Sequence, residues 1–221
     1  MKQVLISLSA TGVFLAVLLV SAGHLGYWQA WAYTALGIVM NLCTRLVLRN
    51  NPDVAIERAK LGKGAKGWDK ALLGLGSLLT LMTLVVAGLD TGRFHWLPAL
   101  SWVWFIAGMA LATAGMLIFL LAMKENRFFS AVVRVQTDRG HTVCSTGPYG
   151  IVRHPGYVGM IIGTLGLPLL LTSVWSGIPA LLSSILLVVR TRLEDAALEK
   201  ELLGYREYQR TTRFRLLPGV W

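Results

Sequence analysis

The chain has 221 residues, of which 55% are hydrophobic, with a mean hydropathy of +0.60 and a formal net charge of +10 at pH 7. Only 14% of the residues are charged, so the composition is too apolar for an ordinary soluble domain. In a soluble protein, a net charge of +10 would suggest a nucleic-acid partner. In so apolar a chain we expect a lipid bilayer as the partner and no nucleic acid.

Apolar runs long enough to cross a bilayer follow one another along the chain. A hydrocarbon core of about 30 Å requires roughly 20 apolar residues in a helix. We expect single membrane helices at 4–22, 28–48, 71–89 and 97–123. The last apolar stretch, 157–189, contains Pro168 and Pro179 and is too long for one crossing, so we expect a hairpin of two shorter helices.

The positions of the basic residues predict the topology. If the first helix enters from the cytoplasm, 20 of the 21 Lys and Arg residues fall on the cytoplasmic side, and only Arg93 falls outside. The positive-inside rule then places both termini in the cytoplasm. A cleavable signal peptide ending near Ala22 is the alternative, but the apolar run exceeds the usual hydrophobic region of about 7 to 15 residues. The predicted fold class is an all-α, multi-pass integral membrane protein with five to six transmembrane helices.

Two regions are expected. Residues 1–123 carry the N-terminal membrane helices and a basic cytoplasmic loop at 49–70, which we interpret as an interfacial loop whose lysines meet lipid headgroups, and to which we assign no chemistry. Residues 124–221 carry the polar cytoplasmic segment 124–156, the hairpin and a C-terminal amphipathic helix broken at Gly204.

The segment 124–156 gathers hydrogen-bonding side chains beside turn-forming Gly and Pro residues. Non-helical polar backbone near a membrane is tolerated where it lines a cavity in the protein, so we expect a site here. The two cysteines, Cys43 and Cys144, lie in different segments and provide neither a disulfide framework nor a metal-ligand cluster.

Two further patterns flank this segment. Gly156, Gly159, Gly163 and Gly166 share one face of the following helix, which suits either close helix packing or a smooth wall for a flat cofactor. Arg190 and Glu194 are four residues apart on a helix that leaves the membrane, so they can pair with each other or point together at a ligand.

Four ordered elements in roughly the last 90 residues resemble the isoprenylcysteine carboxyl methyltransferase family, within a wider group of membrane methyltransferases that includes phosphatidylethanolamine methyltransferases. The elements are Gln136 with His141-Thr142-Val143-Cys144; Gly147-Pro148-Tyr149; Arg153-His154-Pro155-Gly156-Tyr157-Val158-Gly159; and Arg190 with Glu194-Asp195, Gly204-Tyr205 and Tyr208.

The resemblance implies an S-adenosylmethionine site without a Rossmann domain, and the sequence has no G-x-G-x-x-G motif after a strand. It implies that Arg190 faces a lipophilic or prenylated methyl acceptor, so Arg190 and Glu194 are the candidate catalytic residues. Asp195 stands where the family often has a second Glu, which leaves the contacts of that position open. The implied cofactor-binding residues are Gln136, His141, Thr142, Val143, Cys144, Tyr149, His154, Pro155, Gly156, Tyr157 and Glu194.

Several functions fit this pattern. The leading interpretation is methyl transfer to the carboxylate of a prenylated cysteine or an analogue, and a phospholipid amine or a small thiol is the alternative acceptor. A transporter or a non-catalytic scaffold is the alternative of another class, but a transporter would be expected to carry ionisable residues near the midplane of several helices. A reductase on the same architecture is a further alternative. The sequence does not indicate an oligomeric state.

Overall fold

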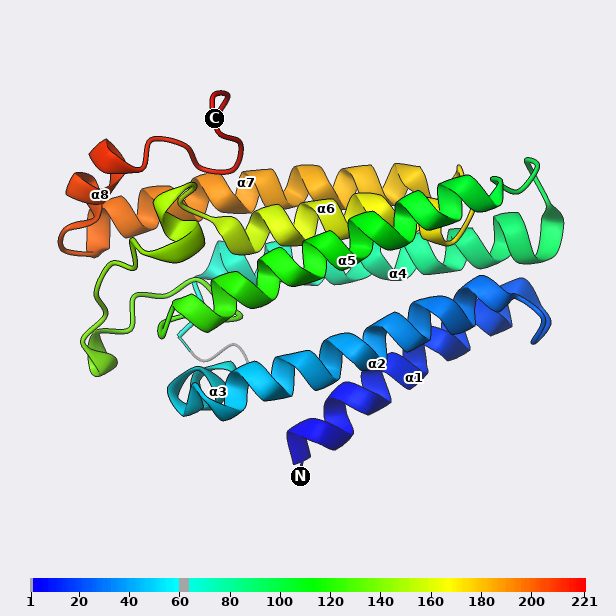
Figure 1. Cartoon of the computed structure of the whole chain (residues 1–221), viewed down its shortest axis with the longest axis horizontal. Helices are drawn as coiled ribbons and strands as arrows, with labels where there is room; N and C mark the ends of the chain where they lie inside the picture. Colours follow the sequence, from blue (N-terminus) through cyan, green and yellow to red (C-terminus); the bar gives the residue numbers. More distant parts are fainter. Residues whose placement is uncertain (1, 60–63) are drawn as a thin grey trace.

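The computed structural model describes residues 2–59 and 64–221, and no β-strand occurs among them. The long helices lie side by side along one axis, and the short helices of residues 52–59 and 205–211 lie at one end (Figure 1). The elements are α1 (Lys2–Ala22), α2 (Trp28–Arg49), α3 (Pro52–Ala59), α4 (Gly67–Ala87), the π-helix η1 (Gly88–Phe94), α5 (Trp102–Glu125), the 3₁₀-helices η2 (Thr137–Arg139) and η3 (Gly147–Gly150), α6 (Pro155–Leu170), α7 (Gly177–Glu201) and α8 (Tyr205–Thr211).

The expected all-helical membrane protein is confirmed at this level. Three helical stretches are both long and apolar enough to cross a bilayer: Trp28–Arg49, Gly67–Phe94 and Trp102–Glu125. Two shorter apolar helical stretches, Ser9–Ala22 and Pro155–Leu170, accompany them. Large apolar side chains such as Leu46 and Trp102 are exposed on the outside of the helices, as a lipid environment requires.

The predicted hairpin is present as α6 and α7. The break between them lies at Leu171–Ser176, where Thr172 has a left-handed φ of 52°. Buried side chains of other helices hold this turn: the Tyr27 hydroxyl donates to the Leu171 carbonyl at 2.7 Å, and the Ser173 hydroxyl donates to Asp90 at 2.6 Å. The turn and η1 lie together at the end of the bundle opposite α3 and α8 (Figure 1).

The glycine stripe packs α6 against α5. A Cβ added to Gly115 of α5 would lie 2.4 Å from the Gly159 carbonyl oxygen, and one added to Gly166 would lie 3.0 Å from the Gly108 carbonyl oxygen. Such distances leave no space for a side chain, so the close-packing interpretation holds for Gly159 and Gly166. Gly156, at the start of the stripe, instead faces the ring of Phe129.

The C-terminal part differs from the expected amphipathic surface helix. Helix α7 continues without a break from the apolar hairpin to Glu201, and Gly204, with a φ of 83°, separates it from the short α8. Leu202 is buried with Tyr205 and Tyr208 against Val143, whereas Leu203 is 96% exposed. Leu198 and Leu202 thus pack against the polar loop of the protein itself, and Leu203 does not.

Candidate functional site

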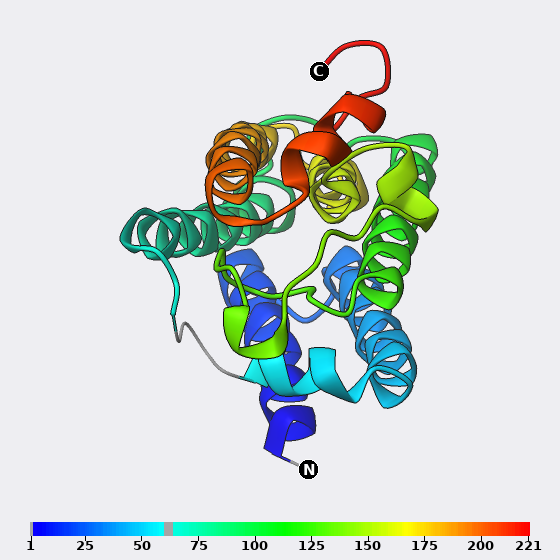
Figure 2. The same ribbon diagram turned by 90° about the vertical axis from the view of Figure 1, so that its left-hand side faces the viewer.

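A cavity of about 270 Å³ lies at the end of the bundle that carries α3, α8 and the polar loop, the end that faces the viewer in Figure 2. Its volume is near the lower end of the range of about 300–1,000 Å³ for ligand pockets. Nine of the predicted site residues line it, whereas Gln136, Thr142 and Pro155 do not. The nine are His141, Val143, Cys144, Tyr149, His154, Gly156, Tyr157, Arg190 and Glu194.

Gln136 supports the cavity from behind. It is fully buried, its side-chain amide donates to the Phe128 carbonyl at 2.6 Å, and its backbone N–H donates to Nδ1 of His141 at 3.2 Å. The His141 ring stacks on Phe128 with the ring centroids 4.4 Å apart. Burial, together with the positive charges of Arg139 and Arg134, lowers the pKa of His141 to about 4. His141 therefore offers the cavity a neutral, hydrogen-bonding ring at pH 7.

Tyr149 and Cys144 form part of the wall on the loop side. The Tyr149 hydroxyl donates to the Ala122 carbonyl at 3.3 Å, and the Tyr149 carbonyl accepts from the Tyr208 hydroxyl at 2.6 Å. Burial raises the pKa of the Cys144 thiol, so it stays protonated and is not an activated nucleophile. These two residues shape the cavity and offer no reactive group.

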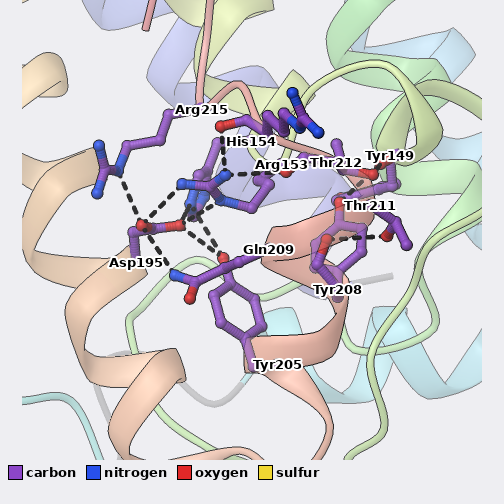
Figure 3. A network of polar contacts seen from close by, with 11 residues as sticks. Tyr149, Arg153, His154, Asp195, Tyr205, Tyr208, Gln209, Thr211, Thr212 and Arg215 are labelled. Atoms are coloured by element: carbon purple, nitrogen blue, oxygen red, sulfur yellow. Dashed lines mark hydrogen bonds and ion pairs between the residues drawn. The ribbon is translucent and has the colours of Figure 1, made fainter.

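Asp195 is the centre of a buried network shown in Figure 3. Its carboxylate accepts from Nε of Arg153 at 2.8 Å, from the Tyr205 hydroxyl at 2.8 Å and from Nε of Arg215 at 2.8 Å, and Nε2 of His154 lies 3.1 Å away. Burial alone would raise the pKa of Asp195, but the hydrogen bonds from His154 and the two arginines hold it well below its usual range. Asp195 is therefore ionised at all ordinary pH values.

Asp195 belongs to the buried interior and not to the lining of the cavity. Only 1% of its side chain is exposed, and it does not line the cavity. Two backbone hydrogen bonds, from the Arg153 N–H to the Phe214 carbonyl and from the His154 N–H to the Arg215 carbonyl, join the same segments. The Asp195 network thus fastens α7, the start of α6 and the C-terminal segment together, which positions the motif residues around the cavity.

Arg190 and Glu194 meet at Tyr157 rather than pairing with each other. The Tyr157 hydroxyl donates to Glu194 at 2.5 Å, and the Arg190 guanidinium lies over the Tyr157 ring, 5.4 Å from its centroid. Arg190 uses Nε to donate to Asp69 at 2.7 Å and Nη2 to donate to the Ala131 carbonyl at 3.0 Å. Both residues line the cavity, and each has a hydrogen-bond partner of its own.

Three residues of the 49–70 segment, for which the sequence predicts no chemistry, belong to this site or support it. Asp69 is fully buried and accepts from Arg190 and from the Val133 N–H at 2.7 Å. Glu57 forms two hydrogen bonds with Arg134 at 2.6 and 2.7 Å, and Arg58 lines the cavity. The position of Asp69 in the first turn of a strongly apolar helix was the sequence feature that could have indicated its role in the site.

Known proteins resemble the region that builds this cavity. Residues 102–200 match the family model of the isoprenylcysteine carboxyl methyltransferase family. The match includes the polar loop, the hairpin, and both Arg190 and Glu194, so the family resemblance inferred from the motifs is confirmed.

Two curated proteins are similar to this chain over part of their length. A probable protein-S-isoprenylcysteine O-methyltransferase from Oryza sativa subsp. indica is 32% identical over 77 residues, which cover 34% of this chain and 40% of that protein. The cobalt-zinc-cadmium resistance protein CzcN from Cupriavidus metallidurans is 30% identical over 139 residues, which cover 62% of this chain and 61% of that protein. The chain thus matches less than two thirds of the length of either relative.

The solved structure of a eukaryotic intramembrane Ras methyltransferase of the isoprenylcysteine carboxyl methyltransferase family shares the fold. The match has a TM-score of 0.60 and 18% sequence identity, and it covers 96% of this chain and 75% of that one. The shared fold therefore includes the N-terminal helices, which lie outside the region matched by the family model.

Proposed function

We propose that this protein is an integral membrane methyltransferase that uses S-adenosylmethionine and methylates a lipophilic acceptor, the carboxylate of a prenylated cysteine or an analogue. The observation that carries the proposal is the convergence of His141, His154, Tyr157, Arg190 and Glu194 on one cavity inside the region that matches the family. These residues come from the loop and from α6 and α7, so only the folded chain brings them together.

The residues of the cavity fit the cofactor chemically. Glu194 supplies an acceptor for the ammonium group or the ribose hydroxyls, and the neutral His141 can hydrogen-bond an uncharged group. Phe128, Phe129 and Tyr149 supply flat walls for the adenine. When bound, the cofactor would supply an electrophilic methyl group on a sulfonium.

Catalysis would then consist mainly of positioning and of excluding water. A carboxylate acceptor needs no general base, because its oxygen is already a nucleophile at neutral pH. An amine acceptor would have to lose a proton, and Glu194 is the acid that lines the cavity. Asp195 cannot take that role, because its carboxylate is already occupied by Arg153, Arg215 and Tyr205.

A second cavity of about 180 Å³ supports a lipophilic acceptor. It lies between α4, α6 and α7 and shares Leu73, Met160 and Arg190 with the first cavity. Its remaining lining is mostly apolar or small, which suits a hydrocarbon chain next to a polar head held near Arg190. The other lining residues are Leu72, Gly76, Ser77, Thr80, Thr164, Ser183, Leu186 and Leu187.

The proposed topology has six passes, made by α1, α2, α4, α5, α6 and α7, with both termini and the cavity on the cytoplasmic side. The basic residues of the polar segments support this orientation, since Arg58, Arg134 and Arg153 all lie at the same end of the bundle as the cavity. A soluble cofactor would reach the site from the cytoplasm.

The proposal is tested by a screen with cofactor carrying a radiolabelled methyl group. The purified protein in detergent is incubated with a farnesylated cysteine analogue, a phospholipid amine and a small thiol, and Glu194→Ala serves as the blank. Label that enters the prenylcysteine as a base-labile methyl ester supports the proposal. Label in the phospholipid or thiol alone would select the alternative acceptor. If the protein neither transferred the methyl group nor bound the cofactor, the proposed function would be wrong.

A further inference from the structure

Arg58 on α3 is a cation of the cavity whose charge no carboxylate of the described residues balances. It comes from the 49–70 segment, outside the region that matches the family model. Its guanidinium lies over the rings of Phe119 and Phe129, 5.8 and 5.7 Å from their centroids. Burial lowers its pKa, but an arginine remains protonated at neutral pH.

The other arginines that line the cavity all have acidic partners. Arg190 is bound to Asp69 at 2.7 Å, and Arg153 is bound to Asp195 at 2.8 Å. Arg134 is bound to Glu57 at 2.6 Å and to Asp138 at 2.9 Å. Among residues 2–59 and 64–221, no hydrogen bond or ion pair joins Arg58 to an acid.

The aromatic contacts place Arg58 beside the motif segment. Phe119 and Phe129 pack edge to face with their centroids 5.2 Å apart. The edge of Phe129 lies against Gly156, where an added Cβ would be only 2.9 Å from a ring carbon. One ring pair therefore connects the Arg58 guanidinium to the start of α6, next to His154 and Tyr157.

A partly desolvated guanidinium favours an anion, because the aromatic rings attract the cation only weakly compared with a carboxylate. Glu194 complements it: this acid lines the same cavity and receives a hydrogen bond from the uncharged Tyr157. The cavity thus contains a cation, Arg58, and an anion, Glu194, that do not form an ion pair with each other. A ligand that carries a carboxylate, with or without an ammonium group, would match this pair.

We propose that Arg58 is a ligand-binding residue that holds the carboxylate of a small molecule in the cavity. The inference rests on the proposed function, which supplies two sources of this chemistry: the amino acid end of the cofactor and the carboxylate of the acceptor. In either case Arg58, rather than the already paired Arg190, provides the uncompensated positive charge.

The test compares ligands that differ only in the carboxylate. Calorimetric titrations use S-adenosylhomocysteine and its decarboxylated analogue for the first source, and an N-acetylated farnesylcysteine and its methyl ester for the second. The variants are Arg58→Gln, which removes the charge, and Arg58→Lys, which keeps it. Arg127→Gln is the matched control, because Arg127 also lies over an aromatic ring, Phe128, but is 65% exposed and does not line the cavity.

We expect Arg58→Gln to weaken binding of one carboxylate ligand by roughly tenfold to a hundredfold, the loss typical of a hydrogen bond to a charged group. Binding of the matching ligand without a carboxylate should not be weakened. Arg58→Lys should recover part of the affinity. The ligand pair that responds identifies the source of the carboxylate.

Equal affinity of wild type and Arg58→Gln for every ligand would overturn the inference and leave the proposed function standing. An equal loss of affinity for the ligands with and without a carboxylate would also overturn the inference, because it would indicate structural damage. If wild type bound none of the four ligands, both the inference and the proposed function would be wrong.

Discussion

The carboxylate of Asp69, near the start of α4, accepts a 2.7 Å hydrogen bond from Nε of Arg190 on α7, 121 residues later in the chain. Asp69 is fully buried, and the Arg190 side chain is 9% exposed. The pair connects the N-terminal helices to the region that matches the family and fixes the guanidinium at the junction of the two cavities.

Removing the charge of Asp69 should therefore impair both stability and activity. We expect Asp69→Asn to lower the free energy of unfolding by about 3–5 kcal/mol, the usual loss when a buried pair keeps one charged partner. Thermal unfolding in detergent measures this loss. Asp53→Asn is the control, because the Asp53 side chain is 55% exposed and its ion pair with Arg127 is 3.6 Å long.

A double variant separates positioning from folding. Asp69→Asn combined with Arg190→Gln leaves no unpaired buried charge, so it should be more stable than Asp69→Asn alone. Methyl transfer should nevertheless stay low in the double variant. Recovered activity would show that Arg190 has no role in the reaction.

The adjacent acids Glu194 and Asp195 should respond differently to loss of charge. Asp195→Asn leaves the buried Arg153 without its ionised partner, so we expect the free energy of unfolding to fall by about 3–5 kcal/mol. Glu194→Gln keeps an acceptor for the Tyr157 hydroxyl and should change stability by less than about 1.5 kcal/mol while weakening cofactor binding. Melting temperatures and titrations on the same preparations compare the two. A reversed pattern would contradict the roles assigned here.

His141 should make stability depend on pH. Its pKa is about 4 in the folded protein and about 6.5 in an unfolded chain, so the unfolded chain binds a proton more readily. The contribution of neutral His141 is complete above about pH 6.5 and is lost as the pH falls toward about 4. The melting temperature should therefore drop between pH 7 and pH 5. His141→Asn should reduce this drop, and an unchanged drop would assign the effect to other groups.

The contact of α5 with α6 should not accept a side chain at Gly115. Gly115→Ala would place a Cβ 2.4 Å from the Gly159 carbonyl oxygen, and we expect a loss of about 1–3 kcal/mol or more. Gly163→Ala is the matched control, because a Cβ there meets no atom within 4 Å. Equal melting temperatures of the two variants would contradict this close packing.

Hydropathy predicted the long helices and the break of the hairpin, because lipid selects long apolar runs whatever they pack against. The motifs also indicated residues of α6 and α7 that line the cavity, among them Tyr157 and Glu194, although not the hydrogen bond between these two. The contact of Asp69 with Arg190 could not be predicted, since it depends on how α4 and α7 are aligned, and apolar composition carries no information about that alignment. The position of Arg58 in the cavity could not be predicted for a related reason. The sequence of a basic loop does not show which of its arginines form ion pairs, and only the fold does.

The central claim is that the cavity binds S-adenosylmethionine through Glu194 and the motif residues. The most direct measurement is a calorimetric titration of S-adenosylhomocysteine into the purified protein in detergent, repeated with Glu194→Ala. We expect saturable binding of one molecule per chain to the wild type and an affinity lower by roughly tenfold or more in the variant, as for loss of a hydrogen bond to a charged group. Absence of binding to the wild type, or an unchanged affinity in Glu194→Ala, would contradict it.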